Sequence, residues 1–241
     1  MSAIITSIYN CPVKSISFQN IDKCKINKNI GIEGDRVFAF SQNLDLDQSK
    51  EFEKNPEARK GKWNKIVTLK NTPVFNKYNF LYENNKLTLT IKDKEIITIN
   101  VNDSNERDNL VKKLIELEGS LKNDIRLMRN DEHPFYDTSI SNKSMFRNSI
   151  SLLNINSIKD FENKIDQKIE KSIFRGNLYF DGIEAWEERN WIGKTIKIND
   201  VLFKVEKNIP RCVAINLKPK TDDNSFNLLK TLKETYDHYD M

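Results

Sequence analysis

The hydrophobic period of the chain changes near Ser104, and this change constrains the fold more than any other feature of the sequence. Between Ala3 and Asn102 apolar and polar residues alternate, as in half-buried β-strands. The alternating runs are AIITSIY, ISFQNIDKCKI, RVFAFS, WNKIVTLK, KYNFLYE, KLTLTIK and EIITINV, with turn residues at Asn27-Lys28-Asn29, Asn84-Asn85 and Asp93-Lys94. We therefore predict a sheet-rich, antiparallel first half.

A helical period follows at SNERDNLVKKLIELEG, with Leu110, Leu114 and Leu117 on one face. Ser104 is the predicted N-cap, and Gly119 is the predicted stop. The polar stretch at 129–148 lacks a period, so we interpret it as a long loop of the kind that lines functional sites.

A second unit begins near Ser149 and mixes strands with helices. The run SIKDFENKIDQKIE places Ile158, Phe161, Ile165 and Ile169 on one helix face, with Ser157 and Asp160 as a capping box. The predicted strands are ISLLN, NLYFDG, KTIKI, VLFKVE and CVAINL, with a hairpin turn at Asn199-Asp200, and SFNLLKTLKETYDHY is a predicted final helix. The fold class expected is α+β, predominantly β.

Composition and charge exclude several functional classes. Among 241 residues, 38% are hydrophobic, 31% are charged, and the net charge is only +4, which suits a small anion better than a nucleic acid. The start carries no signal peptide pattern, and no apolar run is long enough to span a membrane. Three cysteines far apart predict a reducing, cytoplasmic setting without a disulfide framework, and two histidines without a CxxC pair make a structural zinc site improbable.

Cys212 lies in NIPRCVAINLKPKT beside several cationic residues. Positive charge stabilises a thiolate, so the thiol is a candidate for ligation or catalysis. The alternative is a small buried residue on the strand CVAINL. Local charge does not decide between these readings.

Three other stretches combine anion-binding groups with tight turns. CPVKS offers Lys14 and Ser15, GIEGDR offers Arg36, and FRGN offers Arg175 and Asn177. Turns hold such residues for structural reasons as well, so no single stretch is specific. Glu187 and Glu188 resemble a paired-carboxylate site, but adjacent residues point in different directions, which favours a structural loop with packed Trp186 and Trp191.

Together these stretches resemble the MOSC-domain family, in particular members that pair a MOSC domain with an N-terminal β-barrel domain. The matching segments are YNCPVKSI, GIEGDRVFAF, FRGNLYFDGIEAWEERNWIG and RCVAINLKPKT. The resemblance implies an N-terminal barrel-like domain at 1–103, a connecting helix and loop at 104–148, and a MOSC barrel at 149–241. Relatives continue beyond DHYDM with further strands, so the barrel is expected to lack its usual last strands.

The resemblance also implies a molybdenum–pterin cofactor. Cys212 would be the metal ligand and the catalytic residue, and the pterin would be held by Lys14, Ser15, Arg36, Arg175, Asn177 and Arg211. The sequence departs from the family at Cys11, Gly176, Ile215 and Lys218, the last two at positions that border the metal in relatives.

The implied activity is reduction of a small N-hydroxylated compound. The chain has no GxGxxG motif and no cysteine cluster, so the electrons are expected from a separate flavin or iron–sulfur reductase. Two alternatives stay open: a non-catalytic carrier of sulfur or cofactor on Cys212, and a binding module whose cofactor site has decayed. His133 and His238 are further, weaker candidates for general bases.

Overall fold

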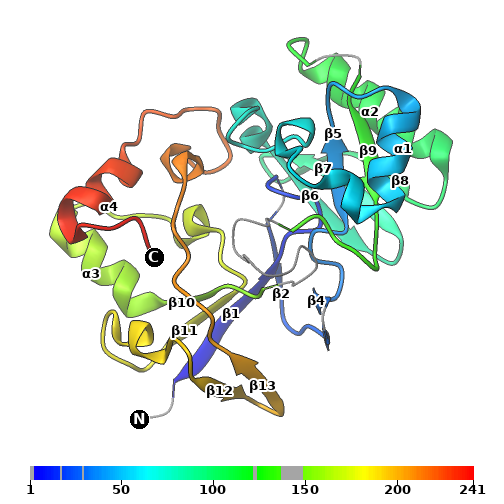
Figure 1. Ribbon diagram of the computed structural model, residues 1–241. Helices are drawn as coiled ribbons and strands as arrows, with labels where there is room; N and C mark the ends of the chain where they lie inside the picture. The colour runs from blue at the N-terminus through cyan, green and yellow to red at the C-terminus, as the bar shows by residue number, and fades with distance from the viewer. Residues whose placement is uncertain (1–2, 17, 29, 122–123, 137–148) are drawn as a thin grey trace. The chain divides into compact units, whose positions relative to one another are not determined.

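The computed structural model describes residues 3–16, 18–28, 30–121, 124–136 and 149–241, which divide into two compact units (Figure 1). The N-terminal unit comprises residues 9–149 and 220–222. The C-terminal unit comprises residues 1–8, 150–219 and 223–241, so the first strand of the chain belongs to it in large part.

Strands and helices are mixed in the chain. The strands are β1 (Ile4–Asn10), β2 (Gln19–Ile21), β3 (Ile26–Asn27), β4 (Gly31–Ile32), β5 (Phe38–Ser41), β6 (Tyr78–Glu83), β7 (Lys86–Ile91), β8 (Lys94–Asn100), β9 (Arg126–Arg129), β10 (Leu152–Asn154), β11 (Leu178–Asp181), β12 (Thr195–Ile198) and β13 (Val201–Lys204). The α-helices are α1 (Leu46–Lys54), α2 (Ser104–Leu117), α3 (Ile155–Ile165) and α4 (Leu228–Tyr236). The α+β class is confirmed, but among the described residues the strands form small sheets without a closed barrel.

The N-terminal unit is built around the antiparallel meander β6–β7–β8. Asn84 and Asn85 both have positive φ, of 51° and 60°, as the tight turn between β6 and β7 requires. Lys92 and Asp93 repeat this geometry between β7 and β8, so the predicted turns are confirmed within one residue. The alternating faces of these strands bury Phe80, Leu87 and Leu89.

Aromatic side chains join the meander to the β5–β9 pair. The ring of Phe40 on β5 lies 5.7 Å from Phe80 and 5.6 Å from Phe75, centroid to centroid. Helix α2 packs on β8 and β9 and buries Leu110 and Leu114. Its N-cap is Asp103, one residue before the predicted Ser104, because the Asp103 carboxylate accepts the backbone N–H groups of the first turn.

Two predictions for this unit are wrong. Residues 46–54 form α1, which the alternating period did not indicate; its start is fixed by a capping box between Asp45 and Gln48. WNKIVTLK is not a strand, since Trp63–Lys65 is a 3₁₀ helix and Ile66 forms only an isolated bridge with Ser41. Ile66 and Val67 are both fully buried, which a half-buried strand does not allow for consecutive residues.

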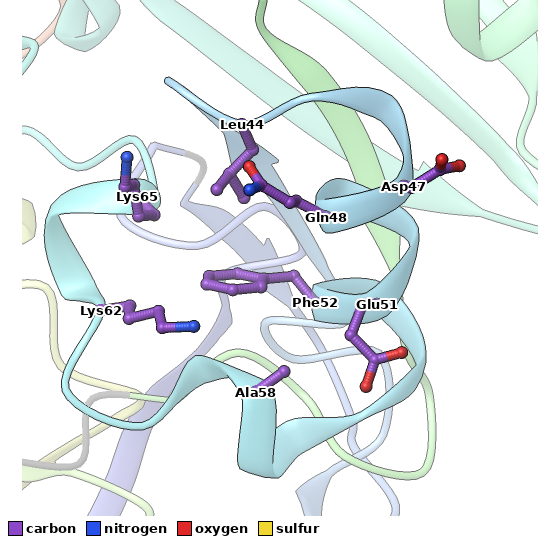
Figure 2. Close-up of a pocket in the computed structure, with 8 residues that line it drawn as sticks. All are labelled: Leu44, Asp47, Gln48, Glu51, Phe52, Ala58, Lys62 and Lys65. Atoms are coloured by element: carbon purple, nitrogen blue, oxygen red, sulfur yellow. The ribbon is translucent and has the colours of Figure 1, made fainter.

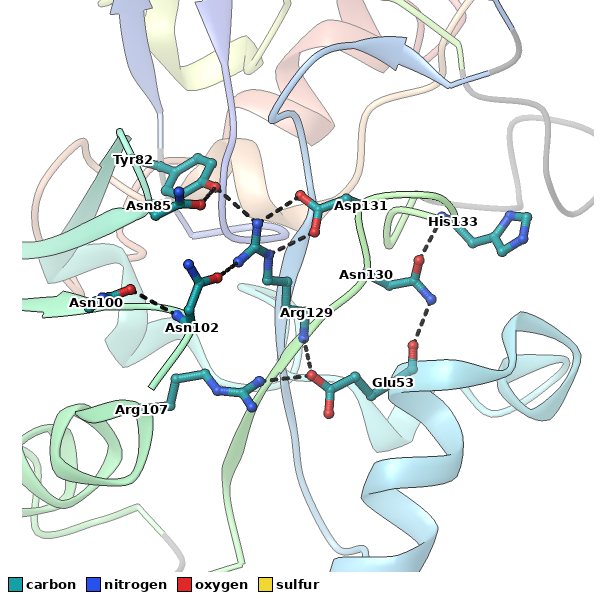
Figure 3. A network of polar contacts seen from close by, with 10 residues as sticks. All are labelled: Glu53, Tyr82, Asn85, Asn100, Asn102, Arg107, Arg129, Asn130, Asp131 and His133. Atoms are coloured by element: carbon teal, nitrogen blue, oxygen red, sulfur yellow. Dashed lines mark hydrogen bonds and ion pairs between the residues drawn. The ribbon is translucent and has the colours of Figure 1, made fainter. Parts of the chain in front are cut away.

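A polar network ties α1, α2 and β9 together (Figure 3). Glu53 on α1 accepts Arg107 Nη1 at 2.8 Å and the backbone N–H of Arg129 at 2.9 Å. The Arg129 guanidinium in turn donates to Asp131, to Asn102 and to the Tyr82 hydroxyl. The network fixes the start of the segment after β9; most of the loop predicted there, at 137–148, lies outside the described residues.

The ionisation of Tyr78 provides a test of the packing in this unit. Burial, together with the nearby Glu118 carboxylate, raises the pKa of Tyr78 to about 12. In the unfolded chain the pKa is roughly 10, so the stability that this group contributes is complete below pH 10 and is lost as the pH rises through 12. A phenolate absorbance titration should show a tyrosine that ionises late, and Tyr78→Phe should remove it. If Tyr78→Phe instead removes a tyrosine with an ordinary pKa, the packing around Tyr78 is contradicted.

The C-terminal unit contains a sheet in the order β10–β11–β1. β10 runs parallel to β11, whereas β1 pairs with β11 antiparallel, from Ile4–Asp181 to Ile8–Leu178. Helix α3 packs on β10 and β11 and also contacts α4. Phe161 of α3 and Leu232 of α4 are fully buried.

Helix α3 starts earlier than predicted. Asn154 is its N-cap, and its side chain accepts the backbone N–H of Asn156. The predicted capping box is wrong, because Ser157 lies inside the helix and donates its hydroxyl to Glu188 at 2.6 Å. The hairpin of β12 and β13 is confirmed, with Asn199 at φ 50° in its turn. No helix in the described part of the chain combines the length and apolarity needed to cross a bilayer.

Candidate functional site

Cys212 is an exposed cysteine in the C-terminal unit. The predicted strand CVAINL is wrong, because Val213–Asn216 form a 3₁₀ helix that begins directly after Cys212. Ile215 and Leu217 are buried and anchor this turn, whereas Val213 is 46% exposed. The reading of Cys212 as a buried core residue is therefore wrong, and its thiol can meet a ligand.

Arg211 connects the cysteine turn to the FRGN segment. Its Nη1 donates to the carbonyl of Phe174 at 2.8 Å, and its Nη2 donates to the carbonyl of Met241. Burial lowers the pKa of Arg211 to about 10, although nearby acidic groups oppose this shift, so the guanidinium is charged at neutral pH. The structure thus brings the Arg-Cys pair and FRGN together.

The FRGN segment is held by the strands beside it. The Asn177 side chain is buried, and its Oδ1 accepts the backbone N–H and the hydroxyl of Ser151, at 3.2 and 3.0 Å. Gly176 donates its backbone N–H to the Tyr179 hydroxyl at 3.1 Å. Arg175 ends a 3₁₀ helix in the left-handed conformation, with φ 53°.

In the N-terminal unit the CPVKS and GIEGDR turns lie against each other. The backbone N–H of Arg36 donates to the carbonyl of Cys11 at 2.7 Å, and the N–H of Lys14 donates to the carbonyl of Phe38 at 2.8 Å. Lys14 is 6% exposed, with its Nζ 5.8 Å from the centroid of the Trp63 ring. The two turns were predicted separately, yet the structure places their cations, Lys14 and Arg36, in one region of the unit, although they lie more than twenty positions apart in the sequence.

Asp35 links these two turns, and the sequence analysis did not single it out. Its buried carboxylate accepts the backbone N–H of Cys11 at 2.6 Å and pairs with the Arg36 guanidinium. Burial opposes the charge on Arg36, but Asp35 outweighs it, and the pKa of Arg36 is raised above its ordinary value. The Tyr136 ring lies 5.3 Å from the guanidinium. The only sequence signal for Asp35 was its place in GIEGDR.

The predicted site residues fall into two groups. Arg175, Asn177, Arg211 and Cys212 belong to the C-terminal unit, and Lys14, Ser15 and Arg36 belong to the N-terminal unit. Within each unit, the hydrogen bonds described above connect the segments that carry these residues.

Strained backbone marks three of these positions. Ser15, Arg36 and Arg175 have φ values of 64°, 55° and 53°, a region that non-glycine residues other than Asn and Asp seldom adopt. Elsewhere in the described chain only Lys92, Trp186 and Lys220 share this feature among such residues. Local strain of this kind concentrates at functional sites.

The family departures lie in different surroundings. Ile215 is 3% exposed, so its side chain belongs to the core of the unit. Lys218 forms an ion pair with Asp223 at 2.5 Å, and its Nζ lies 5.3 Å from the centroid of the Phe226 ring.

The WEE block, Trp186 to Glu188, has a structural role. Glu188 accepts Ser157 and Asn154, and Trp186 donates its Nε1 to Asp160 at 2.7 Å. The Trp191 ring stacks on Phe180 at 5.4 Å. Glu187 and Glu188 do not act as a pair, as the sequence indicated, since Glu187 is exposed and Glu188 is bound to α3.

The two histidines differ in their surroundings. His238 stacks on Tyr236, with ring centroids 5.7 Å apart, and burial with the adjacent Arg189 lowers its pKa. The backbone N–H of His133 donates to Asn130 of the polar network (Figure 3). Its carbonyl accepts Arg59.

A separate pocket of about 460 Å³ lies on the N-terminal unit (Figure 2). Leu44, Phe52 and Ala58 form its apolar part, with Lys62 and Lys65 along one wall. None of the predicted site residues lines it.

The donor chemistry of the cysteine turn fits the predicted cofactor. The described residues contain no cluster of three or more His, Cys, Asp or Glu side chains able to hold a metal ion. An exposed thiol can still supply one soft sulfur ligand, and a cofactor dithiolene would supply the others. The Phe174 carbonyl accepts Arg211, and Arg175 is the next residue along the chain. A cation that can bind a phosphate thus lies in the segment to which the cysteine turn is tied.

Comparison with known proteins agrees with these motifs. Residues 136–239 match the MOSC domain, a match that includes Arg175, Asn177, Arg211 and Cys212. The chain therefore contains a MOSC domain. Lys14, Ser15 and Arg36 precede the matched MOSC domain.

One curated relative is mitochondrial amidoxime reducing component 2 of Rattus norvegicus. It is 33% identical to this chain over 72 residues, which are 30% of this chain and 21% of the relative. The chain thus matches about a fifth of the relative's length.

Proposed function

We propose that this protein binds a molybdenum–pterin cofactor through Cys212 and reduces small N-hydroxylated compounds. The observation that carries the proposal is that Ser15, Arg36 and Arg175, all expected at the pterin from the sequence, have strained left-handed backbone. The exposed Cys212 beside the FRGN segment and the similarity to an amidoxime reducing component support it.

The residues of the chain would have distinct tasks. Cys212 would hold the metal through its thiolate, and Arg175 with Asn177 would orient the pterin from the same unit. Lys14, Ser15 and Arg36 would offer cations and a hydroxyl to the phosphate of the pterin. The bound cofactor would supply two-electron redox chemistry between molybdenum(IV) and molybdenum(VI).

The overall reaction balances with an external donor. An N-hydroxyl compound takes up two electrons and two protons, its N–O bond breaks, and the products are an amine or amidine and water. We propose that a separate flavin or iron–sulfur reductase supplies the electrons.

We also propose a cytoplasmic setting and a MOSC barrel that includes the β10–β11–β1 sheet. Cys11, Cys24 and Cys212 are all free thiols, as expected in a reducing compartment. The barrel itself is an implication of the family resemblance.

The test is metal and cofactor content. Wild-type protein from cells that make the cofactor should carry molybdenum and pterin in about equal amounts per chain, and Cys212→Ser should lose turnover of a hydroxylamine with an artificial electron donor. Cys24→Ser is the matched control and should keep metal and turnover. Wild-type protein without molybdenum or pterin would overturn the proposal.

A second candidate function is a carrier of sulfur or cofactor. It is favoured by the exposure of Cys212, because transfer to a partner needs an accessible thiol. Wild-type protein that binds pterin yet shows no turnover would favour the carrier over the reductase if the Cys212 thiolate also takes the terminal sulfur of a persulfide donor, which leaves as a thiol.

A further inference from the structure

The last residues of the C-terminal unit hold the backbone before Cys212. We call residues Tyr239–Met241 the strap. The backbone N–H of Arg211 donates to the carbonyl of Tyr239 at 2.8 Å, and Pro210 forms an antiparallel bridge with Asp240. The strap therefore fixes the position at which the cysteine turn begins.

Two arginine side chains keep the strap in place. Arg189, which directly follows the WEE block, donates to the carbonyl of Asp240 at 3.4 Å. It also lies 3.2 Å from His238 Nδ1, which accepts the backbone N–H of Asp240. Arg211 donates to the carbonyl of Met241 from the other side. Arg211 uses both prongs of its planar fork, one for Phe174 and one for Met241, and lysine lacks this fork.

Both terminal nitrogens of the Arg211 side chain bind backbone carbonyls inside the protein. Its two terminal nitrogens bind the carbonyls of Phe174 and Met241, and its Nε is buried with no hydrogen-bond partner in the described structure. These two contacts tie the guanidinium to the backbone of the FRGN segment and to that of the strap.

Cys212 depends on these contacts because its own side chain contributes nothing to its position. The thiol is exposed, and among the described residues its sulfur makes no hydrogen bond. On its C-terminal side, buried Ile215 and the contact from Leu229 N to Asn216 hold the turn. On its N-terminal side, only Arg211 and the strap do so within the described chain.

We infer that Arg211 is a positioning residue for Cys212, and that Arg189 and the strap complete this support. The inference replaces the sequence-based role of Arg211 as a direct pterin contact. It rests on the proposed function only in taking Cys212 as the metal ligand. The FRGN segment, the WEE block with Arg189, and the Arg-Cys pair are thereby connected in the support of Cys212.

The first test uses the protein without regard to cofactor. In Arg189→Gln we expect the Arg211 amide to exchange with deuterium roughly three- to tenfold faster, the effect of losing one hydrogen bond from a local opening equilibrium. Iodoacetamide should alkylate Cys212 at a changed rate at fixed pH. Lys164→Gln is the matched control, since Lys164 is also a cation over an aromatic ring, that of Tyr236, and it pairs with Asp160 instead of the strap.

Unchanged exchange and alkylation in Arg189→Gln would overturn the inference. Arg189→Lys, which retains the charge without the fork, gives the same readout if the glutamine variant does not fold. Wild-type protein that lacks molybdenum would overturn the proposed function, but the amide exchange and alkylation of the variants could still be compared with those of the wild type.

The second test uses the loaded protein. Arg211→Lys should retain pterin but shift the electron paramagnetic resonance signal of molybdenum(V), because the thiolate geometry changes. Loss of pterin from Arg211→Lys with normal amide exchange would show direct ligand contact and overturn the positioning role.

Discussion

Replacing Asp35 with alanine should lower the free energy of unfolding by about 3–5 kcal/mol, as expected when one partner of a buried ion pair is removed. Asp35 is 1% exposed, and it satisfies both the Cys11 amide and the Arg36 guanidinium. The variant leaves a partly buried cation without its counter-ion and a buried N–H without an acceptor. Urea unfolding followed by circular dichroism measures the loss.

Asp131→Ala is the matched control for Asp35→Ala. Asp131 also pairs with an arginine, Arg129, at 2.7 Å, but its side chain is 53% exposed. An exposed pair contributes only about 0–1 kcal/mol. If Asp35→Ala costs no more than Asp131→Ala, the carboxylate does not link the two turns in the way that the structure indicates.

The Asp35 link also shows where sequence reasoning ended. CPVKS and GIEGDR were recognised as separate cationic turns, because each carries a local pattern of Gly, Lys, Ser or Arg. Their pairing depends on the bridge between Val13 and Phe38 and on the contact from Cys11 to Asp35. Contacts between segments so far apart have no signature in a single sequence.

Local rules explain which elements were predicted well. The turns of the β6–β7–β8 meander follow from Asn84-Asn85 and Asp93, residues that tolerate positive φ. Helix α1 was missed because its start depends on one capping box. The segment CVAINL was predicted as a strand because its apolar residues Ile215 and Leu217, which are buried, lie two positions apart. Backbone hydrogen bonds to the carbonyls of Cys212 and Ala214 instead close a 3₁₀ helix.

Gly176 provides the second large expected effect, because the position leaves no room for a side chain. A Cβ there would lie 2.0 Å from Leu153 Cδ1 and 3.0 Å from Leu153 Cγ, and Leu153 is itself 2% exposed on β10. Gly176→Ala should therefore destabilise the protein by about 1–3 kcal/mol, as overpacking does in a filled core.

Gly119→Ala is the control for Gly176→Ala, since a Cβ at Gly119 meets nothing within 4 Å and should change stability by less than about 0.5 kcal/mol. Equal unfolding free energies for the two variants would contradict the packing at Leu153. Gly176→Pro would add ring atoms as well and would remove the N–H that Gly176 donates to Tyr179. The glycine and Leu153 are thus a matched pair, and a larger residue at 176 requires a smaller one at 153.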